Sequence, residues 1–176
     1  MNRNSYHPLQ VWIHWIVFLL VVASIASVQL HELMPKGSEI RATFVRIHML
    51  MGQLIFISVA IRLLARFLIK GPEPVQMPQW QVYASKLVHL ALYLWMIVLP
   101  ITGVVFVQAG GKEIQFFSMA LPQLVMPDPA LKSSIKEIHE FLGESIYYLI
   151  GVHAVAALWH HYVQKDDVLK RMSLRK

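Results

Sequence analysis

The stretch from Ile135 to Val163, IKEIHEFLGESIYYLIGVHAVAALWHHYV, decides the fold of this chain. It is longer than the roughly 20 apolar residues that a helix needs to cross a hydrocarbon core about 30 Å thick. At about 100° per residue, His153 returns to within about 40° of His139, so both side chains share one helix face, about 21 Å apart along the axis. The stretch therefore predicts a transmembrane helix that carries histidines at two depths.

Three further apolar stretches have the same character, at about residues 9–30, 44–69 and 85–107. Of the 176 residues, 56% are hydrophobic and 15% are charged, which is too apolar for a water-soluble domain of this size. Backbone groups that face lipid must be paired within their own segment, so each span is expected to be a helix. The prediction is an all-α integral membrane protein, a four-transmembrane-helix bundle that forms one domain over residues 1–176.

The first span also has features of a secretory signal peptide. Arg3 precedes the apolar run, and Ser24-Ile25-Ala26 has the small residues of a cleavage site. However, the run is longer than the usual stretch of about 7–15 residues, and it carries His14 near its start. We therefore expect a retained first helix.

Charge is divided unevenly between the two ends of the predicted bundle. Ten of the 16 Lys and Arg residues fall at the end that holds both termini, and seven of the ten Asp and Glu residues fall at the other end. The positive-inside rule then places both termini in the cytoplasm, and it explains the net charge of +6 better than nucleic-acid binding does. The absence of cysteine excludes disulfides, iron–sulfur clusters and c-type haem attachment.

Six of the nine histidines fall within or at the ends of the predicted spans: His14, His48, His89, His139, His153 and His160. Ionisable groups inside a bilayer are costly and usually functional. Histidines in two layers about 20 Å apart suit two haem irons, each held by two imidazoles, better than one zinc or copper site with three or four clustered ligands.

Matching depths suggest how these histidines pair. His48 and His139 both lie near the outer starts of their spans. His153 lies nearer the cytoplasmic side, where His14 is its natural partner and His89 is a competing one. Because two imidazoles saturate the iron, the expected chemistry is electron transfer rather than oxygen binding. The prediction is two b-type haems enclosed by the bundle, one near each membrane face.

Small and basic residues near these histidines are candidates to surround the porphyrins. Small residues that would let a porphyrin approach the backbone are Gly52, Gly143 and Gly151. The candidates to pair haem propionates are Arg46, Arg62 and Arg66. The competing explanations are plain helix packing for the glycines and anchoring to lipid headgroups for the arginines.

The histidine motifs resemble those of the bacterial cytochrome b561 family. The resemblance rests on Ile13-His14-Trp15, Arg46-Ile47-His48, His89, the pair His139 and His153, and the run Trp159-His160-His161-Tyr162-Val163-Gln164-Lys165-Asp166. It covers essentially the whole chain. It implies that His14 and His153 hold an inner haem and that His48 and His139 hold an outer haem.

The same resemblance implies a quinone site at the cytoplasmic end, where His160 is the first candidate contact and His89 the second. Stand-alone members resemble a superoxide:ubiquinone oxidoreductase. The expected function is therefore an enzyme of the bacterial inner membrane that passes electrons from periplasmic superoxide to ubiquinone. His160, His161 and Asp166 are candidate members of a proton path for quinone reduction.

Two alternative functions remain open at this stage. One is a quinone-linked cytochrome b subunit that exchanges electrons with a periplasmic redox protein, docked on the connection Gln108 to Ser134. The other is a membrane scaffold without redox chemistry, whose histidines serve packing.

The outer end is close to neutral overall, so attraction of superoxide would need a local cluster of the four basic residues Arg41, Arg46, Lys132 and Lys136.

Overall fold

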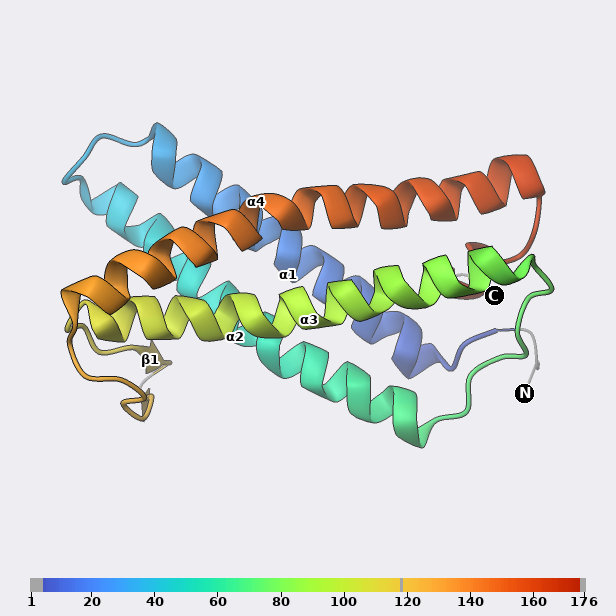
Figure 1. The fold of residues 1–176 in the computed structure, drawn as a ribbon, viewed down its shortest axis with the longest axis horizontal. Helices are drawn as coiled ribbons and strands as arrows, with labels where there is room; N and C mark the ends of the chain where they lie inside the picture. The colour runs from blue at the N-terminus through green and yellow to red at the C-terminus, as the bar shows by residue number, and fades with distance from the viewer. Residues whose placement is uncertain (1–4, 118, 175–176) are drawn as a thin grey trace.

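The computed structural model describes residues 5–117 and 119–174, and within them the chain forms four long helices (Figure 1). These helices are α1 (Pro8–Leu33), α2 (Glu39–Leu68), α3 (Gln79–Ala109) and α4 (Pro129–Trp159). Each of the four is long and apolar enough to cross a membrane. The predicted four-helix membrane bundle is confirmed.

The helices begin earlier than the apolar stretches that predicted them. α3 begins at Gln79 and α4 at Pro129, whereas the sequence placed their starts near residues 85 and 135. The added turn of α4 has a side-chain cap: the carboxylate of Asp128 accepts hydrogen bonds from the first backbone amides of the helix. The added turn of α3 follows Pro78 and has no side-chain cap. The helices therefore extend beyond the apolar core that the hydropathy pattern detects.

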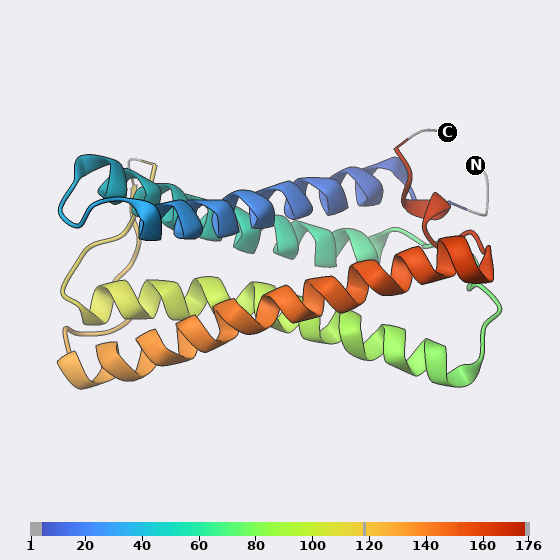
Figure 2. The same cartoon turned by 90° about the horizontal axis from the view of Figure 1, so that it is seen from above.

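The C-terminal end of the bundle is less regular than predicted. The sequence indicated one helix to about residue 163, but α4 ends at Trp159 and is followed by a π-helical turn, η1 (His160–Gln164). A short 3-10 helix, η2 (Lys170–Met172), follows after the chain has reversed direction. The segment after Lys165 lies back against the end of the bundle where α1 begins (Figures 1 and 2).

The four helices form two layers (Figure 2). α1 packs along α2, α3 packs along α4, and a smaller contact joins α2 to α3. The best-buried apolar cluster lies between α1 and α2 and includes Ile13, Val17, Ile55 and the fully buried Val59. Close packing is therefore concentrated within each layer rather than between the layers.

The long connection between α3 and α4 contains a small hairpin rather than a helical piece. Strand β1 (Gln115–Phe116) pairs antiparallel with β2 (Met119–Ala120). The buried side chain of Gln108, at the end of α3, donates to the carbonyl of Pro122 and accepts from the amide of Leu124. These contacts hold the connection against the end of the bundle opposite the termini.

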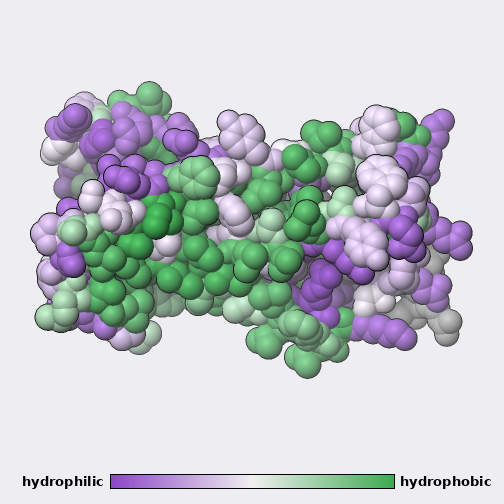
Figure 3. All heavy atoms as spheres, in the orientation of Figure 1, coloured by the Kyte–Doolittle hydropathy of each residue, from purple (hydrophilic) through white to green (hydrophobic). Residues whose placement is uncertain are grey.

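The surface has the distribution of side chains expected of a membrane protein. On the face drawn in Figure 3, apolar residues cover much of the middle and polar residues gather at both ends. Phe67 and Leu68 are each 82% exposed, and Tyr148 is 77% exposed. Many large apolar side chains exposed together are stable when lipid, rather than water, surrounds them. The first and last described residues lie at the same end of the bundle (Figure 1).

We expect the α1–α2 and α2–α3 connections to lie on opposite sides of the membrane. The chain has no cysteine, so single cysteines introduced as Lys36→Cys and Glu73→Cys report each side separately. A membrane-impermeant maleimide should label one variant in spheroplasts and the other in inverted vesicles. Ile57→Cys, within α2, is the control and should be labelled in neither preparation. Labelling of both connections from one side would contradict this topology.

Candidate functional site

Two pairs of histidine rings face each other across the two helix layers. The rings of His48 on α2 and His139 on α4 have their centres 6.2 Å apart. The rings of His14 on α1 and His153 on α4 are also 6.2 Å apart. A metal–imidazole bond is about 2 Å long and the nitrogen lies about 1 Å from the ring centre, so two ligands on opposite sides of one metal have centres about 6 Å apart. Both pairs have this spacing.

A third histidine joins the inner pair. The ring of His89, on α3, has its centre 5.2 Å from that of His153. Its Nδ1 lies 2.6 Å from the carbonyl oxygen of Ser85, one turn earlier in the same helix. The sequence left His14 and His89 as competing partners of His153, and the structure brings both of them beside it. The ring centre of His14 lies 6.2 Å from that of His153, whereas the ring centre of His89 lies 5.2 Å from it.

The two rings of the outer pair are held through Nδ1. The Nδ1 of His48 lies 3.1 Å from the carbonyl oxygen of Ser24, and this oxygen can only accept a hydrogen bond. The Nδ1 of His139 lies 2.9 Å from Oγ1 of Thr102, whose own hydrogen is directed at the carbonyl of Leu99. Both rings therefore carry their hydrogen on Nδ1 and leave Nε2 free. This is the usual second contact of a metal-ligating histidine.

Sequence reasoning did not identify Ser24 or Thr102 as functional residues. In the sequence, Ser24 stood out only as part of a possible cleavage site. In the structure it is buried and contacts His48. Thr102 is likewise buried in the apolar part of α3. A polar residue inside an apolar span could have drawn attention to each, because such groups need a partner in a membrane. The identity of that partner is a tertiary property.

The surroundings of the pairs fit a porphyrin better than a compact metal site. Among residues 5–117 and 119–174, no group of three or more His, Asp or Glu side chains is arranged to hold one metal ion. A porphyrin supplies four nitrogens and leaves two positions for imidazoles, which matches paired rings. A methyl group added at Gly52 or Gly143, one turn after His48 and His139, would meet no atom within 4 Å. The backbone there leaves room for a flat group.

Gly103 has a different role from these open glycines. A Cβ at this position would lie 3.2 Å from Cε1 of His139. Such a contact is tight, so a larger residue would push the imidazole away from His48. Gly103 therefore allows α3 and α4 to approach closely at His139, beside the hydrogen bond that Nδ1 of His139 donates to Thr102.

The three arginines predicted to pair propionates lie in different settings. Arg62 is partly buried, with Nε donating to the hydroxyl of Tyr93 and Nη1 donating to the carbonyl of Gln10. It is near enough for its charge to act on the rings of both His14 and His153. Arg46 is instead bound to Glu39 at 2.6 Å at the surface, and Arg66 is exposed. Arg62 is the one directed into the bundle.

The basic residues of the outer end are largely paired with acids. Arg46 contacts Glu39, and the amine of Lys136 lies 3.3 Å from the carboxylate of Glu140. Arg41 has Glu32 at 3.6 Å and donates to the carbonyl of Met34. The expected cluster of Arg41, Arg46, Lys132 and Lys136 therefore has three members with a neutralising partner. Long-range attraction of an anion to this end is weak.

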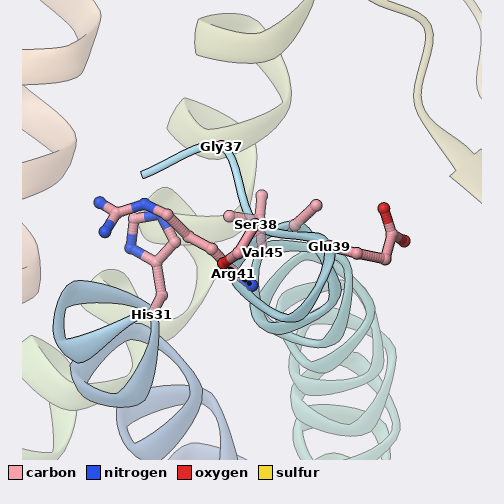
Figure 4. Close-up of a pocket in the computed structure, with 7 residues that line it drawn as sticks. His31, Gly37, Ser38, Glu39, Arg41 and Val45 are labelled. Atoms are coloured by element: carbon pink, nitrogen blue, oxygen red, sulfur yellow. Dashed lines mark hydrogen bonds between the residues drawn. The ribbon is translucent and has the colours of Figure 1, made fainter. Parts of the chain in front are cut away.

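A shallow cavity of about 270 Å³ opens beside these outer residues, at the junction of α1 and α2 (Figure 4). His31, Ser38, Glu39, Arg41 and Val45 are among its lining residues, and the side chains of His31 and Arg41 lie together in it. None of the paired histidines lines this cavity. It is thus separate from the seam between the layers.

His160 lies just beyond α4, in the π-helical turn η1. Its backbone keeps helical angles, with φ −56° and ψ −44°, and its amide donates to the carbonyl of Ala156, so the wider turn begins at His160 itself. Its Nδ1 lies 2.5 Å from Oδ2 of Asp166. The side chains of His160 and Asp166 are only 14% and 19% exposed. The structure thus brings these two members of the candidate proton path together.

Several known proteins are similar to this chain over nearly its whole length. The family model for prokaryotic cytochrome b561 matches residues 5–173. Cytochrome b561 homolog 1 of Escherichia coli is 34% identical over 98% of this chain and 99% of its own length. The protein named Probable superoxide oxidase CybB of Yersinia pestis is 33% identical over 99% of this chain and 98% of its own length. Cytochrome b562 of Cereibacter sphaeroides is 26% identical over 97% of this chain. The chain therefore belongs to the prokaryotic cytochrome b561 family.

Proposed function

We propose that this chain carries electrons across the bacterial inner membrane from superoxide to ubiquinone, using two b-type haems. Membership of the family establishes the coarser function, which is membrane electron transfer by an oxidoreductase with b-type haem. The observation that carries the finer proposal is the equal 6.2 Å spacing of two histidine pairs on opposite halves of the bundle.

The four haem ligands in this proposal are His14 with His153, and His48 with His139. Both pairs have the centre-to-centre spacing of about 6 Å that two imidazoles on one metal require. The narrower spacing of His89 from His153 favours His14 as the inner ligand. When bound in this way, each haem supplies reversible one-electron transfer, because the iron has no free position for oxygen.

The chain's own groups would hold each haem in a fixed setting. The carbonyl of Ser24 and the hydroxyl of Thr102 orient the outer rings through Nδ1. Arg62, anchored by Tyr93, is the best placed of the predicted arginines to pair a propionate of the inner haem. Gly52 and Gly143 leave space beside the outer ligands. These groups would bind and orient the cofactors without moving.

The choice of substrates rests on the relatives and on the two ends of the bundle. The Yersinia pestis relative is named as a probable superoxide oxidase, which supports superoxide as the donor. Quinone is assigned to the opposite end, beyond His153, where His160 is the first candidate contact and His89 the second. The basic excess at this end supports a cytoplasmic location for it and for both termini.

A second candidate function is supported by the connection between α3 and α4. Its side chains include several large apolar residues that are exposed at the outer end: Phe117, Met119, Leu124 and Met126. Such residues suit docking of a periplasmic redox protein, and paired surface charges make long-range attraction of superoxide weak. Copurification of such a partner would favour this alternative over superoxide oxidation.

We expect the purified protein to contain two haems, each lost separately. His48→Leu or His139→Leu should remove one haem, and His14→Leu or His153→Leu should remove the other, so that haem content falls by half. His89→Leu is the matched control and should retain both. Pyridine haemochrome analysis together with the reduced absorption spectrum measures the content. Loss of a haem in His89→Leu with full content in His14→Leu would reverse the assignment of the inner ligand.

Thr102→Val should weaken haem binding at His139 while leaving the shape of the side chain almost unchanged. The substitution removes the acceptor of the Nδ1 hydrogen, and loss of such a contact typically costs about 10–100-fold in metal affinity. Haem transfer to an excess of apomyoglobin measures the affinity. Ser134→Ala, which removes an exposed hydroxyl from α4, is the control. Equal haem loss in both variants would contradict the role of Thr102.

Superoxide should reduce the outer haem at a rate that depends only weakly on salt, because the basic residues nearby are paired. Glu39→Gln frees Arg46 from its partner and should raise the rate about two- to three-fold at low ionic strength. Pulse radiolysis measures this rate. Glu73→Gln makes the same charge change at the opposite end and should leave the rate unchanged. A steep fall of the wild-type rate with salt would contradict the weak attraction.

A further inference from the structure

Arg62 is a positive charge inside the bundle whose contacts are all with neutral groups. Its Nε donates to the hydroxyl of Tyr93 on α3 at 3.1 Å, and its Nη1 donates to the backbone carbonyl of Gln10 on α1 at 3.3 Å. In the part of the chain that the structure describes, no carboxylate forms an ion pair with this guanidinium. The charge of Arg62 is therefore not cancelled by an acid of the described chain.

Three helices hold this charge in one place. The side-chain amide of Gln10 donates to the carbonyls of Ala65 and Ile69, at the end of α2, at 3.3 Å each. Gln10 thereby joins α1 to α2, and its own carbonyl accepts from Arg62. Tyr93 packs against the buried cluster between α1 and α2 and holds the guanidinium from α3. A charge that is fixed in this way does not have to be ordered when a cofactor binds.

The fixed charge lies close to the inner histidine pair. Gln10, which accepts from Arg62, lies one turn before His14 on α1. The charge of Arg62 acts on the rings of both His14 and His153. A permanent positive charge is therefore part of the surroundings of the inner site.

The outer pair has a different electrostatic setting. Glu140 follows His139 in α4, and its negative charge acts on the ring of His139. Lys136 lies 3.3 Å from the carboxylate of Glu140, and more than half of each side chain is exposed, so solvent screens both charges. Arg46 is bound to Glu39 at the surface. These two basic side chains at the outer end lie against acids, whereas Arg62 does not.

A fixed positive charge favours the reduced state of a nearby haem iron. Reduction from the ferric to the ferrous state adds one negative charge, which a neighbouring cation stabilises. The interaction is stronger inside the bundle than in water, because less solvent screens it. Net charge and burial are among the properties that set such potentials. A propionate paired with Arg62 would have its own negative charge offset, which acts in the same direction.

We propose that Arg62 gives the inner haem site a higher reduction potential than the outer one, so that an electron that enters the bundle settles between His14 and His153. The electron moves from the outer iron, which is oxidised, to the inner iron, which is reduced, and no bond or proton changes. This inference rests on the proposed function, because it requires one haem at each histidine pair. It adds the residue that sets the direction of transfer.

Equilibrium redox titration of the purified, haem-loaded full chain tests this role. The absorption spectrum should show two one-electron steps, and His139→Leu, which should keep only the inner haem, identifies the inner step. In Arg62→Gln, the preference of the electron for the inner site should fall about ten-fold, which corresponds to about 59 mV for one-electron couples. The potential of the outer site should stay the same.

Two further variants separate the effect of charge from that of structure. Arg62→Lys keeps the positive charge and should keep the preference within about two- to three-fold of the wild-type value. Lys70→Gln removes an exposed positive charge just after α2, at the same end of the bundle. It should leave both potentials almost unchanged, because solvent screens an exposed charge.

Tyr93→Phe decides the question if Arg62→Gln loses the inner haem. The substitution removes the hydroxyl that holds Nε of Arg62 and keeps the packed ring. The guanidinium is then free to turn towards solvent, so the preference for the inner site should fall about two- to three-fold. An unchanged preference in a fully loaded Tyr93→Phe protein would count against the role of Arg62.

The possible failures can be told apart. A purified wild-type chain that binds only one haem contradicts the proposed function, and this inference fails with it. If two haems are present, an inner potential equal to or lower than the outer one overturns this inference alone. Unchanged potentials in a loaded Arg62→Gln protein, or an equal change at both sites, would also overturn it and leave the haem ligands as proposed.

Discussion

The spacing of the histidine pairs across the seam between the two helix layers is the constraint on which the rest of this structure depends. Rings whose centres lie 6.2 Å apart leave room for one metal atom between them and are too far apart to bond to each other directly. α4 supplies one ring to each pair, whereas its partners come from α1 and α2. Most of the contact between helices lies within each layer, and Tyr93, Met96 and Ile97 of α3 pack across the seam against the cluster between α1 and α2.

The bilayer makes the setting of each ring more demanding than it would be in water. No solvent reaches the seam to satisfy a stray polar group, so each imidazole nitrogen that is not used by a cofactor needs a partner from the protein. Ser24, Ser85 and Thr102 provide such partners through backbone carbonyls or a hydroxyl. Rings held this way keep their free nitrogens in place, and a fixed geometry suits the one-electron chemistry of a b-type haem protein.

The two ends of the bundle differ in ways that matter for its chemistry. At the outer end, Arg41, Arg46 and Lys136 lie against acids, so this surface has little net attraction for anions. At the inner end, the C-terminal segment folds back and shields an ionised carboxylate beside His160. One end thus has its basic side chains neutralised, and the other holds an ionised carboxylate against an imidazole.

The sequence by itself determined the four-helix membrane fold, the depth of each histidine and the family. Hydropathy records how long each apolar stretch is, and the 14-residue spacing of His139 and His153 follows from helix periodicity alone. Only the tertiary structure decided which side chains meet: that Ser24 and Thr102 hold the outer rings, that Arg46 is bound to Glu39, and that Asp166 returns to His160. The contacts of Ser24 and Thr102 join different helices, and that of Asp166 crosses an irregular π turn. Helix periodicity has no information about these, because they depend on how the helices pack and where the last turn of α4 widens. The pair Arg46–Glu39 lies within α2, where the choice of side-chain conformation decides whether the two charges meet.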